Sequence, residues 1–593
     1  MNRIKKIASR INRWRYKKLN DMSFMIVISI VIGVVSALVA IVLKYLVHFI
    51  TNLLSRISFS GFENIMYLIY PMIGIFFTII VVRYLLKEQL GEGVPKVLYA
   101  ISRNKAILKP MSMVSAMVGS ALTVGFGGSV GLEGPTIATG ASVGSNIGRL
   151  LKLNYRQTAL LLVCASAGAM AAIFKSPIAA MVFVLEVMML DLTAASIVPL
   201  LISTVTATLI SYLFLGTDVI YSIDSVATFS IGNFPYYIVL GILAGFASLI
   251  FTRIYRMSHD FFEKHFKSWG YSLIFGGLAL GALIFIIPSF YGEGYNAINN
   301  CLHGDVTSMF KESVFSRFGS GMFWILIFLL ASVVLKCVTT NLTFGAGGLG
   351  GIFAPTLFIG SHLGVLFALA VNYYDLGDIS TVNFALAGMG GCIAGVIHAP
   401  LTAIFLIAEL TGGYTMFLPL MITSVFSFIT IRLFESHSVY TYQLAKQGDL
   451  LTHNTDENTL KMLSIDKLIE KNFITINYDA TLGDVVKVIA RSTRNIYPVV
   501  DNENTFYGIV TLDDVRPIMF DQDSYDEIFV KDIMRMPSDQ IKLHDKVEIA
   551  AEKFRQNDLY NMVVLNEDKY VGFVSRANLF SEYRKTLKEF SEE

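Results

Sequence analysis

Long apolar stretches recur through the first three quarters of this chain, and they constrain its fold more than any other feature. A straight helix needs about 20 apolar residues to cross the hydrocarbon core of a bilayer, and several stretches reach that length. The chain of 593 residues is 54% hydrophobic and only 16% charged, which excludes a disordered or mainly soluble protein. We therefore expect a polytopic helical membrane domain. The stretches cover residues 23–55, 66–86, 111–126, 157–174, 177–215, 234–256, 271–289, 320–340, 352–371 and 400–434.

Charge divides the chain into a basic front and an acidic tail. From residue 456 onward acidic residues outnumber basic ones, although the whole chain has a net charge of +2. Eight basic residues between Arg3 and Lys18 precede the first apolar stretch, and no small-residue cleavage site follows it. The positive-inside rule predicts that this end is cytoplasmic. We predict a basic segment over residues 1–22, a membrane domain over 23–447, a polar linker over 448–460 and a soluble tail over 461–593.

Two motifs occur twice at nearly the same spacing, which predicts that the membrane domain consists of two duplicated halves. Gly127–Pro135 shares both leading glycines, a third glycine and its proline with Gly347–Pro355. Ser176–Glu186 resembles Ala399–Glu409, at almost the same separation along the chain. Backbone that leaves a helix inside a membrane must be buried in protein or line a cavity. Paired Gly/Pro-rich breaks therefore indicate broken or re-entrant helices around a transport site.

A helix that begins after such a break suits an anion. Its free N–H groups and its dipole attract negative charge without a fixed cation, and Pro135 and Pro355 fit the first turn of a helix. Glu133 lies inside the first break, where a carboxylate at membrane depth costs roughly 2.5 to 3.5 kcal/mol. We interpret Glu133 as a pH-sensitive gate or proton carrier that occupies the anion's site when ionised. The alternative is a purely structural cap of the helix.

Several other polar residues near apolar stretches each allow more than one role. Glu92 lies in the Gly-rich segment 91–95 and belongs either to the pathway or to a solvated loop. Glu186 and Glu409 end equivalent apolar segments, which favours a structural role at helix ends or between the halves. Tyr440 follows the last apolar stretch and would suit an interfacial anchor.

The tail shows short β runs that alternate with amphipathic helices. Tyr497–Thr511 is similar to the later segment Asn561–Ser575. We therefore predict a tandem α/β module over about 461–520 and 528–588.

The motifs Gly91–Pro95, Gly131–Pro135 and Gly350–Pro355, followed by Ala399–Thr402 and a two-part tail, resemble the CLC family of chloride channels and chloride/proton antiporters. The tail resembles a pair of CBS domains. The resemblance implies an all-α membrane domain of two inverted repeats with tilted and re-entrant helices, followed by a small α/β CBS-pair domain. It also implies a homodimer in the cell membrane with one anion pathway per subunit, and with the N-terminus and the CBS tail in the cytoplasm.

The resemblance also implies roles for individual residues. Glu133 matches the external gating glutamate, and Tyr440 matches the tyrosine whose hydroxyl touches the central anion, with Tyr442 as the fallback. The backbone of Ile352 and Phe353 matches the amides that hold that anion. The residues expected around the anion are Gly91, Glu92, Gly93, Val94, Pro95, Gly131, Leu132, Glu133, Gly134, Pro135, Gly351, Ile352, Phe353, Ala354 and Tyr440.

Two departures from the family pattern bear on function. Glu92 stands where the family usually has a serine that helps coordinate the anion, and a carboxylate there would repel an anion unless it is protonated or turned away. Val187 stands where proton-coupled members commonly have an internal glutamate. We therefore expect a gated chloride channel. The alternative is a chloride/proton antiporter with a different internal proton route.

The CBS resemblance bears on cofactors. Nucleotide-binding CBS domains usually hold the ribose with a Ser or Thr and an Asp three residues later, a pattern that Thr511 and Asp514 match. Ser575 is instead followed by Asn578. We expect at most one adenine-nucleotide site, no other cofactor and no metal site. A tail that dimerises and regulates without a ligand is the alternative.

Two other classes of function fit the sequence poorly. A CBS-regulated cation transporter would need clustered carboxylates at membrane depth, and the apolar stretches have too few. An intramembrane enzyme would need a base near Ser129 or a zinc motif such as His-Glu-x-x-His. No His or Lys lies close to Ser129 in the sequence, although folding could bring a distant one close, and the zinc motif does not occur. The expected partners are chloride or other small anions, protons and the lipid bilayer, with no nucleic acid.

Overall fold

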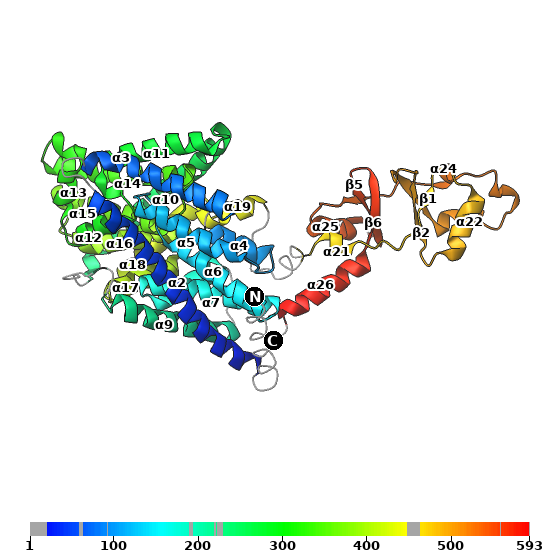
Figure 1. Ribbon diagram of the computed structural model, residues 1–593, viewed down its shortest axis with the longest axis horizontal. Coiled ribbons are helices and arrows are strands. Elements are labelled where there is room, and N and C mark those ends of the chain that lie inside the picture. The colour runs from blue at the N-terminus through cyan, green and yellow to red at the C-terminus, as the bar shows by residue number, and fades with distance from the viewer. Residues whose placement is uncertain are drawn as a thin grey trace. The chain divides into compact units, whose positions relative to one another are not determined.

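The computed structural model describes residues 20–57, 63–91, 93–188, 194–218, 221, 229–447, 460, 463–557 and 559–591. The chain divides into two compact units, Met1–Leu450 and Leu451–Glu593. The first unit is helical, and the second contains both β-sheets (Figure 1). Most of the predicted basic segment and of the predicted linker, and also Glu92, lie outside the described residues.

The first unit is a bundle of helices of very different lengths (Figure 1). Its first half contains α2 (Asp21–Ile57), α3 (Glu63–Ile79), the π-helical η1 (Ile80–Leu85), α4 (Gly93–Ser102), α5 (Pro110–Gly125), α6 (Glu133–Leu150), α7 (Tyr155–Phe174), α8 (Pro177–Val187) and α9 (Ala194–Leu215). Its second half contains η2 (Ile231–Asn233), α10 (Phe234–His265), α11 (Trp269–Ile286), η3 (Pro288–Phe290), α12 (Tyr295–Leu302), α13 (Val306–Glu312), η4 (Val314–Arg317), α14 (Met322–Gly345), α15 (Phe353–Tyr373), α16 (Thr381–Ile397), α17 (Pro400–Leu410), α18 (Phe417–Arg432) and α19 (Val439–Gln447).

Eight helices in the described part of the chain are long and apolar enough to cross a membrane. Five further apolar helices have only 10–17 residues, which is short for a straight span. The expected polytopic membrane domain with short, interrupted helices is confirmed. Two predicted stretches are each divided, because 177–215 forms α8 and α9, and 400–434 forms α17 and α18.

Helix α16 was not predicted from the sequence. Of α6, only the start near Pro135 was predicted. Both helices are buried along most of their length, so they need small side chains for close packing more than large apolar ones. A Cβ at Gly144 of α6 would overlap the backbone of Leu161 in α7. In the same way, a Cβ at Gly388 of α16 would overlap the backbone oxygen of Gly360 in α15. Small residues therefore allow close packing at the centre of this unit.

The two halves repeat the same local conformations. Lys175 ends α7 and His398 ends α16 in the left-handed region, with φ of 55° and 61°. In each case a proline then begins a helix of 11 residues, α8 or α17. The predicted duplication thus extends from the motifs to the helices that they delimit.

The second unit consists of two modules with one topology. In each module the first strand pairs parallel with the second, and the second pairs antiparallel with the third. The strands are β1 (Ile476–Asn477), β2 (Ile496–Val500), β3 (Phe506–Thr511), β4 (Gln540–Lys542), β5 (Asn561–Asn566) and β6 (Lys569–Ser575). The helices are α21 (Ile465–Leu468), α22 (Leu482–Arg491), α23 (Leu512–Val515), η5 (Asp523–Tyr525), α24 (Val530–Ile533), α25 (Val547–Asn557) and α26 (Arg576–Ser591). This is the predicted small α/β domain.

Each module has its own hydrophobic core, but the start of the tail joins the later one. Ile465 and Leu468 of α21 are buried among residues of the second module, such as Val564 and Leu579. Glu470 also forms a backbone bridge to Phe573 of β6. The two modules are therefore interleaved at their boundary.

Candidate functional site

The two Gly-rich breaks meet at the centre of the membrane unit. Gly131 and Gly351 form an antiparallel bridge in which each N–H donates to the other residue's carbonyl, at 2.8 and 2.7 Å. Helix α6 begins two residues after the first of these glycines, and α15 begins two residues after the second. The bridge therefore holds two helix N-termini at one place.

Two threonines reinforce this bridge reciprocally. The hydroxyl of Thr343 accepts the N–H of Ser129 at 3.1 Å, and the hydroxyl of Thr123 accepts the N–H of Leu349 at 3.0 Å. Each break thus rests on a helix of the other half, as duplicated halves that share one site require.

The first predicted motif adds a third helix N-terminus. A Cβ at Gly93, the first residue of α4, would overlap the carbonyl of Gly134 in α6, so the two backbones touch. Val94 and Pro95 are buried behind this contact. Gly91 is exposed just before it. The three motifs that the sequence singled out therefore converge.

Glu133 is buried where α6 and α15 begin, with 1% of its surface exposed. Its Oε1 accepts the hydroxyl hydrogen of Tyr295 at 2.9 Å. Its Oε2 lies over the bridge, because a Cβ at Gly131 would overlap it. Oε2 makes no hydrogen bond of normal geometry to the described residues. The backbone N–H groups of Glu133 and Ala354 nevertheless interact with the carboxylate.

The surroundings of this carboxylate stabilise negative charge. The first N–H groups of an α-helix have no partner within the helix, and the helix dipole places positive potential there. Ile352 precedes α15 and Phe353 begins it, and both are buried, with 1% and 0% of their surface exposed. Leu132, Gly134, Pro135 and Ala354 are buried at the same two helix starts. A small anion could take the place of the Glu133 carboxylate.

The two candidate tyrosines near the end of the membrane unit differ in their surroundings. Tyr440 is buried, with 3% of its surface exposed, at the start of α19, which packs against α4 and α16. Tyr442 instead lies under the guanidinium of Arg256, at 3.8 Å from the ring centroid. Arg256 in turn pairs with Glu435 at 2.5 Å. Tyr442 thus belongs to a polar cluster with Arg256 and Glu435.

Three polar residues near Glu133 were not predicted. Glu293 lies just before α12, Tyr295 is the first residue of α12, and Lys336 lies in the middle of α14. Lys336 has no exposed surface and donates to the Ser129 hydroxyl at 2.8 Å. A lysine inside an apolar helix of 24 residues is a signal that could have been read from the sequence.

Glu186 and Glu409 lie between the halves, as the structural interpretation predicts. Glu186 of α8 accepts the N–H groups of Leu401 and Thr402, at 3.0 and 2.8 Å. Glu409 of α17 accepts those of Ile178 and Ala179, at 3.1 and 2.8 Å. Each carboxylate therefore caps the helix that contains the other.

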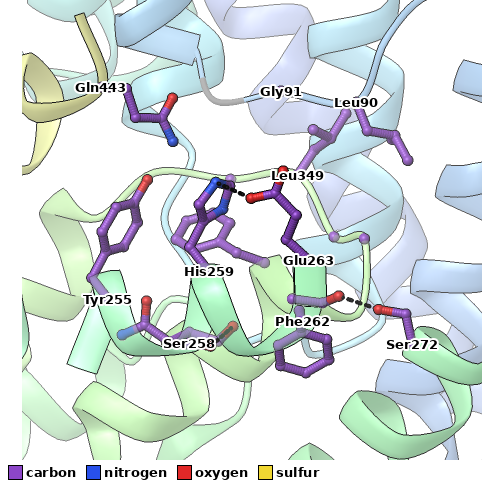
Figure 2. Close-up of a pocket in the computed structure, with 16 residues that line it drawn as sticks. Leu90, Gly91, Tyr255, Ser258, His259, Phe262, Glu263, Ser272, Leu349 and Gln443 are labelled. Carbon is purple, nitrogen blue, oxygen red and sulfur yellow. Dashed lines mark hydrogen bonds and ion pairs between the residues drawn. The ribbon is translucent and has the colours of Figure 1, made fainter. Parts of the chain in front are cut away.

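A cavity of about 370 Å³ opens beside two of the breaks (Figure 2). Gly91 and the segment Gly347–Gly350 line one side of it, and side chains of α10 line another. On α10, His259 and Glu263 point toward one another and form an ion pair at 3.9 Å when the histidine is protonated (Figure 2). The cavity therefore lies between α10 and the Gly-rich segments.

Comparison with known families matches most of the membrane unit to one of them. Residues 73–432 match the family model described as voltage gated chloride channel, and residues 465–521 and 530–585 match the CBS domain. The chain belongs to the CLC family. Its motifs around Gly91, Glu133 and Phe353 are thus those of a CLC protein with a CBS pair.

Among the relatives of this CLC protein, some are named as chloride channels and others as exchange transporters. It is 30% identical over 387 residues to a Ralstonia nicotianae protein named as a putative chloride channel protein ClcB-like, covering 64% of this chain and 86% of that one. It is 28% identical over 431 residues to the H(+)/Cl(-) exchange transporter ClcA of Vibrio cholerae, covering 70% and 88%.

Solved structures share the CLC fold. A slow cyanobacterial Cl⁻/H⁺ antiporter matches with a TM-score of 0.61 and 24% identity, covering 72% of this chain and 99% of that one. A eukaryotic CLC transporter matches with a TM-score of 0.60 and 16% identity, covering 94% and 99%.

The CBS pair contains a cavity of about 820 Å³ between its modules. Thr511, Asp513 and Arg535 are among its lining residues. The Thr511 hydroxyl donates to Asp514 at 2.6 Å, and this pair forms a capping box at the start of α23. Arg535 approaches Asp514 at 3.4 Å. Thr511 thus faces the cavity while Asp514 holds the helix start.

Proposed function

We propose that this CLC protein exchanges chloride for protons across a membrane. The observation that carries the proposal is the Glu133 carboxylate, which is buried at the shared start of α6 and α15. The free N–H groups at the starts of α6 and α15 suit either a carboxylate or a small anion, but not both at once. Proton binding to Glu133 and anion binding are therefore linked.

The linkage works through charge. An ionised Glu133 occupies the positive ends of the two helices and excludes chloride. A protonated Glu133 loses its attraction for these helix ends, so the side chain withdraws and chloride enters. The site attracts the anion by helix dipoles, so the anion also leaves readily.

The relatives named as H(+)/Cl(-) exchange transporters favour exchange over the channel that we expected from the sequence. That preference rested on one residue, Val187, which is buried at the end of α8. The exchange transporter of Vibrio cholerae aligns over 70% of the chain, a much broader similarity than one position. We therefore adopt the antiporter, with a proton route that does not depend on a glutamate at position 187.

Flux in liposomes tests this function. Purified protein is reconstituted with a chloride gradient, the membrane potential is clamped with a potassium ionophore, and chloride efflux and internal pH are recorded together. Proton movement opposite to chloride movement at a fixed ratio is expected. The matched variant Glu133→Gln should move chloride without protons. Chloride movement without proton movement in the unaltered protein would instead identify a channel.

We also propose that the protein is a homodimer of the cell membrane with the N-terminus and the CBS tail in the cytoplasm. The basic residues between Arg3 and Lys18 support this orientation. Protease added to sealed cells should leave the tail intact. Cross-linking in native membranes should give one band at twice the subunit mass.

For the tail we propose one adenine-nucleotide site in the cavity that Thr511 lines. The hydroxyl of Thr511 and the guanidinium of Arg535 are suited to a ribose and a phosphate. Calorimetric titration of the full-length protein with ATP should show saturable binding that Arg535→Ala weakens. Absence of heat at millimolar ATP would leave the tail as a dimerising and regulatory module without a nucleotide.

A further inference from the structure

A second carboxylate, which is half-buried, lies beside the proposed gate. Glu293 precedes α12 by two residues, and its carboxylate interacts with the backbone N–H of Leu132, the residue before Glu133. The segment around it is pinned to the first Gly-rich break, because Gly292 donates its N–H to the carbonyl of Gly127 at 3.2 Å. Glu293 and Glu133 are close enough to repel one another.

Charged and titratable groups from several elements face Glu293. Lys44 of α2 and Lys336 of α14 attract it, and Glu133 of α6 repels it. The hydroxyls of Tyr221 and Tyr295 also interact with it electrostatically.

Lys336 is the best placed of these groups to balance Glu293. A Cβ at Gly294, next to Glu293, would lie 3.6 Å from the Lys336 Nζ. The same ammonium donates to Ser129 and lies 4.9 Å from the ring centroid of Phe358. Its hydrogen bond goes to a hydroxyl rather than to a carboxylate, so Lys336 acts on Glu293 through its charge.

Two neighbouring carboxylates share protons. Removing both protons places a second negative charge beside the buried Glu133, so such pairs release their protons in two separate steps. Lys44 and Lys336 offset part of the repulsion and favour the charged form of one member. The two carboxylates therefore titrate as a coupled pair and not independently.

We propose that Glu293 is a second proton-binding group of the gate, which exchanges a proton with Glu133 and so sets the pH at which the gate opens. The proton leaves one carboxyl group and arrives on the other, so the total charge of the pair does not change in this step. Glu293 does not replace Glu133 at the helix starts; it acts on Glu133 through its charge.

This inference rests on the proposed function, and two substitutions of opposite sign test it. Glu293→Gln removes a negative charge near Glu133, so Glu133 should protonate at lower pH, and the midpoint of acid-activated chloride flux should fall by about one pH unit. Lys336→Met removes a positive charge and should raise that midpoint. Glu293→Asp keeps the charge and should restore a midpoint near that of the unaltered protein.

The measurement is chloride flux in liposomes over a series of external pH values, with each variant first checked for a single symmetric peak in size-exclusion chromatography. An unchanged midpoint in Glu293→Gln would overturn the inference. Shifts of the same sign in Glu293→Gln and Lys336→Met would also overturn it. If Glu293→Gln does not fold, the shift in Lys336→Met decides. Absence of chloride flux in the unaltered protein would instead overturn the proposed function.

Discussion

The hydroxyl of Tyr295 is a direct hydrogen-bond donor to the gate carboxylate, at 2.9 Å from Glu133 Oε1. A hydrogen bond to a charged group is worth about 1.5 to 3 kcal/mol, and about 1.4 kcal/mol corresponds to one pH unit. In Tyr295→Phe the ionised form of Glu133 loses this stabilisation. We therefore expect acid activation of chloride flux to shift to higher pH by about one unit, measured as flux against pH in liposomes.

Tyr221 provides the matched control. Its ring lies 6.1 Å from that of Tyr295, and its buried hydroxyl makes no hydrogen bond to the described residues. Tyr221→Phe should therefore leave the midpoint within a few tenths of a pH unit. A shift in Tyr221→Phe equal to that in Tyr295→Phe would show that the hydroxyl of Tyr295 has no special role.

Gly131 leaves room for the Glu133 carboxylate. A Cβ at this position would overlap Oε2 of Glu133, so Gly131→Ala should displace the carboxylate from the start of α6. We expect faster chloride flux at neutral pH and a weaker dependence on pH. Gly321→Ala is the control, because a Cβ there meets nothing within 4 Å. Unchanged pH dependence in Gly131→Ala would contradict this position for the carboxylate.

At the scale of helices, the two halves are joined by exchanged caps. Glu186 caps α17 and Glu409 caps α8, and each carboxylate accepts two backbone N–H groups. A lost helix cap typically costs about 1 kcal/mol. Glu186→Ala should therefore lower the apparent Tm of the detergent-solubilised protein by a few degrees. Proton coupling should persist, because this role is structural.

A substitution of Thr402 removes only part of this cap and so allows a comparison with Glu186→Ala. Its hydroxyl also donates to Glu186, at 2.6 Å, in addition to its backbone N–H. Thr402→Val removes only the hydroxyl bond, so its effect on the apparent Tm should be smaller than that of Glu186→Ala. Loss of proton coupling in Glu186→Ala at an unchanged Tm would instead place Glu186 on the proton route.

At the scale of the whole molecule, the chain consists of a membrane unit and a tail with separate cores. A fragment over residues 460–593 includes α21, whose Leu468 is fully buried in the later core. We expect this fragment to unfold cooperatively in urea, followed by circular dichroism. A fragment that starts at residue 474 lacks α21 and should unfold at lower urea concentration. Equal midpoints would contradict the interleaving of the modules.

Much of the architecture could be predicted from local patterns. Long apolar stretches predicted a membrane domain, repeated Gly/Pro motifs predicted duplicated halves, and alternation in the tail predicted paired α/β modules. Helix α16 is apolar but escaped prediction, because the small residues that its close packing needs, such as Gly388, interrupt the run of large apolar side chains. The division of 177–215 was missed because two consecutive apolar helices look like one stretch.

Sequence alone determined that Glu133 is a carboxylate in a Gly-rich break before a helix, because backbone chemistry and hydropathy are local properties. Only the tertiary structure decided which groups face it. Tyr295 is 162 residues away in the chain, and the bridge from Gly131 to Gly351 spans both halves. Such contacts depend on how buried helices pack, and packing is set by the shapes of side chains from distant segments rather than by any pattern along one of them.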